Sequence, residues 1–190
     1  GMREVQRNFD RRRVNHIILL TDGQTYGDEQ ACLNLASEAA ARNIGITGMG
    51  IGADWNDIFL DALASRTGGS SAYISKPGDI ERILVEKFRS LANTFADEVL
   101  MEMTPTEGID LKYAFRMQPE PGPLAIGDTM KLGTILQDEP LSVLFEFVVQ
   151  PSALQGSSVV LMNSLVKIAV TAHPHGTAPI RLRLVREVQT

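Results

Sequence analysis

Hydrophobic residues in the first half of the chain form short runs separated by segments with helical spacing. Residues 14–20 are a mainly apolar run that stops at Thr21-Asp22-Gly23, and residues 44–52 and 71–75 form two further runs. Runs of this kind are typical of strands buried on both faces of a helix-covered sheet. Because a helical segment follows each run, residues 14–95 predict a mostly parallel α/β sheet with right-handed crossovers.

The segments between these runs have the spacing of amphipathic helices. Residues 31–42 are rich in Ala and Leu, and Asp54 or Asn56 can cap a second helix that Gly68-Gly69 ends. Further along, apolar residues recur at steps of three and four: Ile80, Ile83, Leu84, Phe88, Leu91 and Phe95. This spacing predicts a long helix from Ile80 to Phe95.

Beyond Asp97 the spacing changes to the period of two that strands show. Alternating segments lie at 99–103, 109–116, 129–136, 141–149 and 180–185, with one or two strands in 158–172 and turns rich in Pro and Gly between them. They predict an all-β antiparallel sandwich of about 95 residues, with His173-Pro174-His175 in a loop. We therefore expect two domains, an α/β part at residues 1–96 and a β-sandwich at residues 97–190.

Composition and charge narrow the classes of function. The 190 residues carry a net charge of −5 with a pI near 5.2, which argues against a nucleic-acid partner. Arg11-Arg12-Arg13 are expected to be a solvated segment. Cys32 is the one cysteine, so no internal disulfide can form, and its helical position predicts a small buried thiol. No apolar run approaches the roughly 18 residues of a membrane span, and the compartment is left open.

Asp22 is the main candidate for a functional side chain. Open α/β sheets bind ligands at the carboxyl ends of their strands, and Asp22 directly follows the first strand. The alternative is that Asp22 caps its own loop. Trp55 follows the second strand near the same edge, where it either packs over the sheet or contacts a partner, and Asp54 and Asp57 beside it are predicted to be helix-entry acids.

Other motifs give weaker indications. Gly48-x-Gly50-x-Gly52 lacks the spacing of a dinucleotide loop, so we expect tight packing there. The two imidazoles beside Pro174 have no cysteines or clustered acids near them, which does not favour a metal site. His16 lies in or beside a buried strand and Cys32 in a helix, so no nucleophile is paired with a base. The sequence therefore predicts a protein that is not an enzyme.

Residues 14–95 resemble the second half of a von Willebrand factor A domain. The match consists of Ile17-Ile18-Leu19-Leu20-Thr21-Asp22-Gly23, Gly48-Met49-Gly50-Ile51-Gly52 and Leu63-Ala64-Ser65-Arg66-Thr67-Gly68-Gly69, in the family's order and spacing. The resemblance implies a metal-ion-dependent adhesion site built from an Asp-x-Ser-x-Ser loop, a threonine on a second loop and the Asp of the Thr-Asp-Gly loop. Only the last has a counterpart here, Asp22. The Asp-x-Ser-x-Ser loop belongs to an earlier strand, and Ser70-Ser71 do not match its position.

The resemblance implies a protein–protein interaction module whose full-length parent binds a protein partner through Mg²⁺ or Mn²⁺. One carboxylate is too few to hold such an ion, so we expect this chain alone to bind none. An alternative is an accessory subunit that presents a client to a motor or to a metal-insertion enzyme complex. A third possibility, a nucleotide-binding domain, would need phosphate loops that the sequence lacks.

The resemblance also places the strand that bears Asp22 beside the family's first strand, which this chain does not include. Val14 to Leu20 is then expected to have an unpaired apolar edge, which tends to pair with another chain. We therefore expect a homodimer through this edge, unless residues 2–13 cover it.

Overall fold

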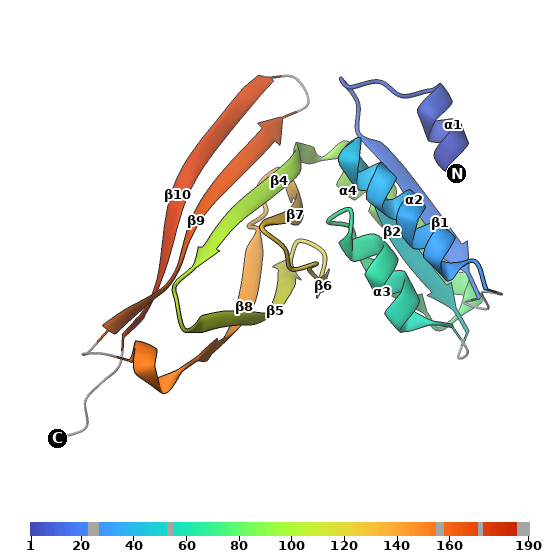
Figure 1. The fold of residues 1–190 in the computed structure, drawn as a ribbon. Coiled ribbons are helices and arrows are strands. Elements are labelled where there is room, and N and C mark those ends of the chain that lie inside the picture. Colours follow the sequence, from blue (N-terminus) through green and yellow to red (C-terminus); the bar gives the residue numbers. More distant parts are fainter. Residues whose placement is uncertain (23–26, 53–54, 155–157, 171–172, 186–190) are drawn as a thin grey trace.

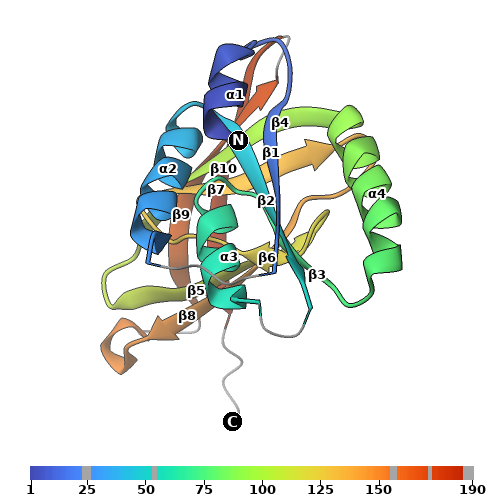
Figure 2. The ribbon, with the colours of Figure 1, turned by 90° about the vertical axis from the view of Figure 1, so that its right-hand side faces the viewer.

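The computed structural model describes residues 1–22, 27–52, 55–154, 158–170 and 173–185, with the backbone alone after residue 168. The first part is a parallel sheet of β1 (Asn15–Thr21), β2 (Ile44–Ile51) and β3 (Ser71–Ile74), in the order β1-β2-β3. Its helices are α1 (Met2–Arg7), α2 (Glu29–Ala41), α3 (Asp57–Ser65) and α4 (Ile80–Ala92), the last preceded by a 3₁₀ turn, η1 (Pro77–Asp79). Helices α2 and α3 cover one face of the sheet and α4 lies on the other side (Figures 1 and 2). The predicted parallel α/β sheet is confirmed.

Strand β1 is an edge strand, because in the described sheet it has one neighbouring strand, β2. The prediction that β1 is buried on both faces was wrong: its residues are half-buried and Leu20 is 43% exposed. Ile17 and Leu19 pack toward α2 and α3, where Met2 and Val5 of α1 join the same cluster. Since α1 lies on that face, it does not replace a neighbouring strand, and no described strand pairs with Val14–Leu20 on the side away from β2, as the sequence predicted.

The helices differ from their predicted bounds where other contacts compete. Asn56 caps α3, its Oδ1 accepting the backbone N–H of Phe59 at 2.9 Å, while Asp54 lies outside the described residues. Helix α4 ends at Ala92 instead of Phe95, because Thr94 already pairs with the sandwich opposite Leu136.

The predicted apolar stripe of α4 is only partly buried. Phe88 is 60% exposed, whereas Lys87 beside it is 8% exposed. A groove of about 370 Å³ separates α4 from the sheet, and its lining includes Met49, Ile83 and Lys87. The helix is therefore turned so that a lysine, not a phenylalanine, faces the interior.

The second part is a β-sandwich, as the alternating pattern predicted. Its strands are β4 (Thr94–Pro105), β5 (Ile109–Gln118), β6 (Gly122–Pro123), β7 (Thr129–Leu136), β8 (Ser142–Val149), β9 (Ser158–Val170) and β10 (His173–Val185), with a 3₁₀ turn, η2 (Pro151–Ala153), after β8. They form two antiparallel sheets, β10-β9-β4-β7 and β6-β5-β8. The prediction of a loop at His173-Pro174-His175 was wrong, since β10 begins at His173, opposite Val170 of β9.

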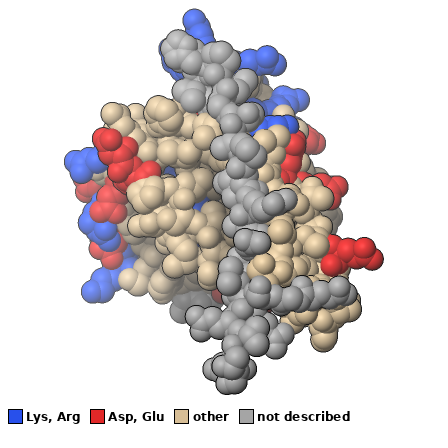
Figure 3. Space-filling model, turned by 90° about the vertical axis from the view of Figure 1, so that its left-hand side faces the viewer, with Lys and Arg blue, Asp and Glu red and all other residues tan. Residues whose placement is uncertain are grey.

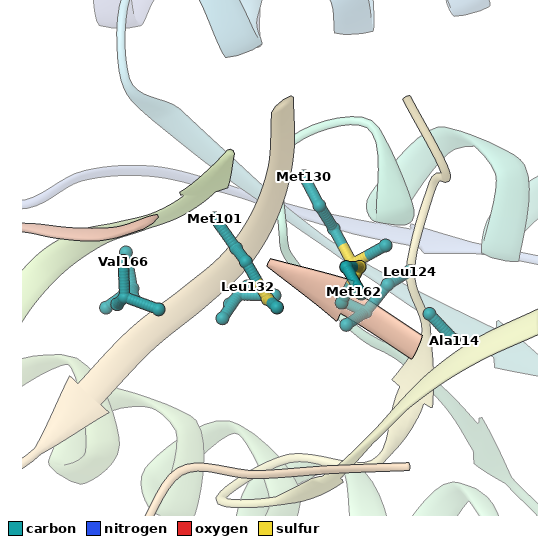
Figure 4. Close-up of a cluster of buried hydrophobic side chains, with 8 residues drawn as sticks. Met101, Ala114, Leu124, Met130, Leu132, Met162 and Val166 are labelled. Carbon is teal, nitrogen blue, oxygen red and sulfur yellow. The ribbon is translucent and has the colours of Figure 1, made fainter. Parts of the chain in front are cut away.

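The sandwich core lies between its two sheets (Figure 4). Its buried members are Val99, Met101, Ala114, Leu124, Met130, Leu132, Met162 and Val166. Three methionines among them provide flexible side chains that fill irregular space between the sheets. The β-sandwich therefore has a hydrophobic core of its own, separate from the cluster between α2, α3 and β2.

The sandwich binds the amino-terminal edge of the parallel sheet. Asn43, just before β2, donates from Nδ2 to Asp97 at 3.1 Å. Lys131 of β7 donates to the carbonyl of Ala40 at the end of α2, at 2.6 Å. Arg116 of β5 reaches the carbonyls of the Gly68-Gly69 turn before β3. The arrowheads of β1 and β2 point away from the sandwich (Figure 1), so the described strands of the sandwich do not cover the carboxyl ends of β1 and β2.

Candidate functional site

The carboxyl edge of the parallel sheet combines a carboxylate with two stacked aromatic rings. Gly50 pairs with Thr21 of β1 on one side and with Tyr73 of β3 on the other. The rings of Trp55 and Tyr73 stack with centroids 5.8 Å apart and planes 7° apart. Asp22 is exposed and directly follows Thr21. The edge therefore presents an acid and an aromatic surface in the position where the sequence predicted a ligand site.

Glycine at position 50 makes room for this aromatic pair. A Cβ on Gly50 would lie 2.3 Å from the indole ring of Trp55. A Cβ on Gly48 would lie 3.3 Å from Leu60 of α3. Tight packing is thus confirmed at these two glycines. It was wrong for Gly52, where a Cβ would meet no described atom within 4 Å and where the positive φ of +84° is what favours glycine. Of the two alternatives for Trp55, the structure shows packing over the sheet, with Tyr73 as the more exposed ring.

Asp57 is exposed at the first position of α3, and its Oδ1 accepts the backbone N–H of Ile58 at 2.8 Å. It is the helix-entry acid that the sequence predicted. In the described parts of the chain, no three His, Cys, Asp or Glu side chains lie together as metal ligands would. Magnesium prefers several converging oxygen ligands, so Asp22 with its described neighbours does not fit a metal site by itself.

The remaining sequence candidates lie away from this edge. Cys32 is partly buried in α2, where burial raises the pKa of its thiol, aided by the nearby Asp28. The structure describes no side chains for His173 and His175, which belong to β10. Cys32, His173 and His175 therefore do not form a common site with Asp22.

Arg11, Arg12 and Arg13 are exposed, as predicted, and two of them pair with Asp10 at 3.2 and 3.6 Å. On the face shown in Figure 3, basic and acidic residues intermingle along the margins around neutral residues. Among the described residues on that face, no extended surface of one charge is visible. No helix in the described residues is long and apolar enough to cross a membrane.

A buried polar network that the sequence analysis missed lies behind β2. Lys87 Nζ donates to Glu120 Oε1 at 2.6 Å, and the same carboxylate accepts from Ser70 at 2.7 Å and from Ser90 at 3.3 Å. Burial tends to raise the pKa of Glu120, but Lys87, Ser70 and Arg116 outweigh it and hold that pKa below its usual value. Glu120 is therefore an ionised carboxylate that joins α4 and Ser70, just before β3, to the sandwich.

His16 lies close to this network and contacts the neighbouring strand β2 through Thr47. Its Nε2 is 2.9 Å from Thr47 Oγ1. Burial lowers the pKa of His16 to about 3, and the nearby Lys87 contributes in the same direction. The imidazole is consequently neutral at ordinary pH.

The depressed pKa of His16 predicts acid sensitivity. Between its unfolded pKa of about 6.5 and its folded pKa of about 3, the unfolded chain binds a proton that the folded chain does not. Stability therefore falls as the pH falls through this window. From about pH 7.5 to about pH 5.5 we expect the free energy of unfolding to drop by about 1.4 kcal/mol from this residue. Urea denaturation at both pH values measures this drop in the free energy of unfolding. The variant His16→Gln should lack this part of the pH dependence, and an equal drop in both proteins would contradict the assignment.

No protein-family profile matches the chain. It is 29% identical over 136 residues to an uncharacterized protein of Synechocystis sp., a match that covers 67% of this chain and 32% of that protein. A solved structure described as von Willebrand factor type A from Catenulispora acidiphila matches 97% of this chain and 46% of its own, with a TM-score of 0.68 at 18% identity. The human COPII-coat protein Sec24c matches all of this chain and 28% of its own, with a TM-score of 0.53 at 15% identity.

These likenesses to solved structures show that the chain has a von Willebrand factor A-like fold. At identities of 18% and 15% they concern the fold alone. The chain spans about a third of the length of the Synechocystis protein and less than half of the Catenulispora chain.

Proposed function

We propose that this chain is a non-enzymatic protein–protein interaction module that recognises a protein partner at the carboxyl edge of its parallel sheet. One observation carries the proposal: Asp22 and the Trp55–Tyr73 pair share this accessible edge, while the opposite edge is held by the sandwich. A ring pair beside a carboxylate suits a partner that offers both an apolar and a polar contact.

The chemistry of the other candidates supports a role in binding rather than catalysis. A nucleophilic cysteine needs a lowered pKa, whereas burial raises that of Cys32. A general base needs a pKa near the working pH, whereas that of His16 is about 3. Neither residue supports covalent or acid–base catalysis.

In a longer protein, Asp22 would be one ligand of a Mg²⁺ or Mn²⁺ ion whose other ligands come from residues outside this chain. Support comes from the von Willebrand factor A-like fold and from the position of Asp22 at the end of β1. Since the described donors around Asp22 are too few, the chain alone is expected to bind no metal.

The proposal is tested by capturing partners from a lysate of the source organism on immobilised chain, on Asp22→Asn and on Glu107→Gln, with and without a chelator. Glu107 is an exposed acid on the sandwich and serves as the matched control. We expect at least one partner to bind the chain and the control but to be depleted on Asp22→Asn. A partner set that is the same on all three proteins would contradict recognition at this edge. Capture that needs no divalent ion would contradict a metal role in that contact.

We also propose that β1 pairs with β1 of a second copy. Asn15–Leu20 are half-buried to exposed, apolar from Ile17 on, and lie at the sheet edge. Two-fold symmetry makes the new pair antiparallel and joins the two sheets into one.

Sedimentation equilibrium tests this dimer. A charge on the edge should hinder pairing, so Leu20→Lys is expected to weaken self-association at least about tenfold. Leu35→Lys, on α2, alters a leucine of similar exposure away from the edge and should leave self-association unchanged. A wild-type chain that stays monomeric at about 0.5 mM would contradict the dimer.

A further inference from the structure

The outer face of the sheet β6-β5-β8 carries an exposed apolar patch. Tyr113 pairs across the strands with Glu146, and Phe115 pairs with Leu144. The pairs between them, such as Ala114 with Phe145, point into the core. We call six of the outward residues the β5–β8 outer face: Tyr113, Phe115, Met117, Leu144, Glu146 and Val148. Asp110, which is exposed and pairs with Val148, borders this face.

This surface is unusually apolar for a solvated sheet face. Tyr113, Met117, Leu144 and Val148 are between 43% and 57% exposed. The rings of Tyr113 and Phe115 stack with centroids 6.1 Å apart and planes 23° apart. Contiguous exposed apolar residues of this kind mark interaction surfaces.

Glu146 places a negative charge within the patch. No cation pairs with it in the described residues. The nearby Lys112 is paired with Asp110, at 3.3 Å. Flanked by Leu144 and Val148 on its own strand, the Glu146 carboxylate complements a cationic side chain that has apolar residues on either side.

Strand β8 also has a free edge. It is the last strand of its sheet and pairs with β5 on its other side. In the described residues, no backbone hydrogen bond outside that pairing involves Ser142–Val149. An extended segment could add to this edge through its backbone, with alternate side chains on the outer face.

We propose that the β5–β8 outer face and the β8 edge bind an extended segment of a partner protein. Its outward residues would be an arginine or lysine opposite Glu146, with an apolar residue on either side opposite Leu144 and Val148. The cation would also lie near the Tyr113 ring, where a cation–π contact is favourable. This surface is separate from the edge that bears Asp22, and it gives the sandwich a recognition role of its own.

The charge pattern disfavours a second copy as the occupant. Antiparallel pairing of β8 with β8 of another copy, in the register that matches Leu144 with Val148, sets the two Glu146 carboxylates directly opposite each other. Like charges in that position destabilise a strand pair. A cationic strand satisfies the same apolar contacts without this repulsion.

Fluorescence anisotropy with two labelled peptides tests the proposal. The probe is Thr-Val-Thr-Arg-Thr-Val-Thr, which reads the same in both strand directions, and the comparison peptide has Glu in place of Arg. We expect the Arg peptide to bind the chain at least about fivefold more tightly than the Glu peptide. In Glu146→Lys the preference should reverse, because the central charge pair is inverted.

Glu107→Lys makes the same charge change at an exposed site off the patch and should keep the wild-type preference. Circular dichroism confirms that each variant is folded. The proposal is overturned if the Arg peptide fails to saturate by about 1 mM, or if both peptides bind equally. Self-association that Leu144→Lys abolishes and Leu20→Lys leaves unchanged would also overturn it, since the occupant would then be a second copy.

Discussion

Replacing Arg116 by Met is expected to lower the free energy of unfolding by about 3–5 kcal/mol, the range for breaking a buried charged contact. Arg116 is 2% exposed and donates to four carbonyls. Those of Gly69 and Leu132 lie at 2.8 and 2.9 Å, and the others belong to Gly68 and Glu120. Methionine fills a similar volume but leaves these acceptors unsatisfied. It also removes a positive charge near the ionised Glu120 carboxylate.

Urea denaturation followed by circular dichroism measures this effect. Arg89→Met, at an exposed position of α4, makes the same chemical change away from the junction. It is expected to change stability by less than about 0.5 kcal/mol. Arg116→Lys keeps the charge but loses the forked set of N–H donors. Its free energy of unfolding should therefore lie between those of Arg116→Met and Arg89→Met. If Arg116→Met and Arg89→Met were equally stable, the junction would not depend on the guanidinium.

Gly133→Ala is expected to destabilise the fold by about 2–5 kcal/mol, through the same junction. Gly133 has φ +100°, a backbone conformation that side chains rarely allow. A Cβ there would lie 2.1 Å from Arg116 Nη1 and 2.5 Å from the carbonyl oxygen of Gly68. The added methyl group must therefore displace the guanidinium from its acceptors or separate β7 from the Gly68 turn.

Gly78→Ala is the control for Gly133→Ala. Gly78 lies in η1, and a Cβ there would meet no atom within 4 Å. Its replacement should be neutral or should slightly stabilise the protein by restricting the unfolded chain. Thermal melts of the two variants separate local strain from the general effect of losing a glycine. Equal melting temperatures would contradict a tightly packed contact at Gly133.

Local spacing was enough to predict most of the fold. The apolar run that stops at Thr21 predicted β1, and the edge position of that strand followed from the family resemblance. Period-two alternation after Asp97 predicted the antiparallel sheets, because that spacing reflects one buried face. Asp22 was placed at a strand end because the run and its turn are contiguous in sequence.

The junction could not be predicted in the same way. Lys87 and Arg116 are charged residues at positions that the helical and strand patterns assign to solvent. They are buried because Glu120 and the carbonyls of the Gly68 turn, distant in sequence, meet them there. The same contacts turn α4 so that Phe88, predicted in its buried stripe, is 60% exposed. The spacing of residues along the sequence does not indicate which distant residues will become partners of a buried charge.

The junction connects the fold to the proposed function. Arg116, Lys131 and Asn43 hold the sandwich against the amino-terminal edge of the parallel sheet. The three contacts come from separate elements, so the sandwich acts as a support that leaves the carboxyl edge accessible. The two proposed recognition surfaces, at Asp22 and at the β5–β8 outer face, then lie on different parts of one chain.

The most direct test of the account is the affinity of a captured partner for the chain and for Asp22→Asn, measured by calorimetry. The amide keeps the size of the exposed side chain and removes its charge, so the fold should be unaffected. The account predicts that the partner binds Asp22→Asn at least about tenfold more weakly, and binds Glu107→Gln as tightly as the unmodified chain. Equal affinity for the chain and Asp22→Asn would show that the carboxyl edge of the sheet is not the recognition site.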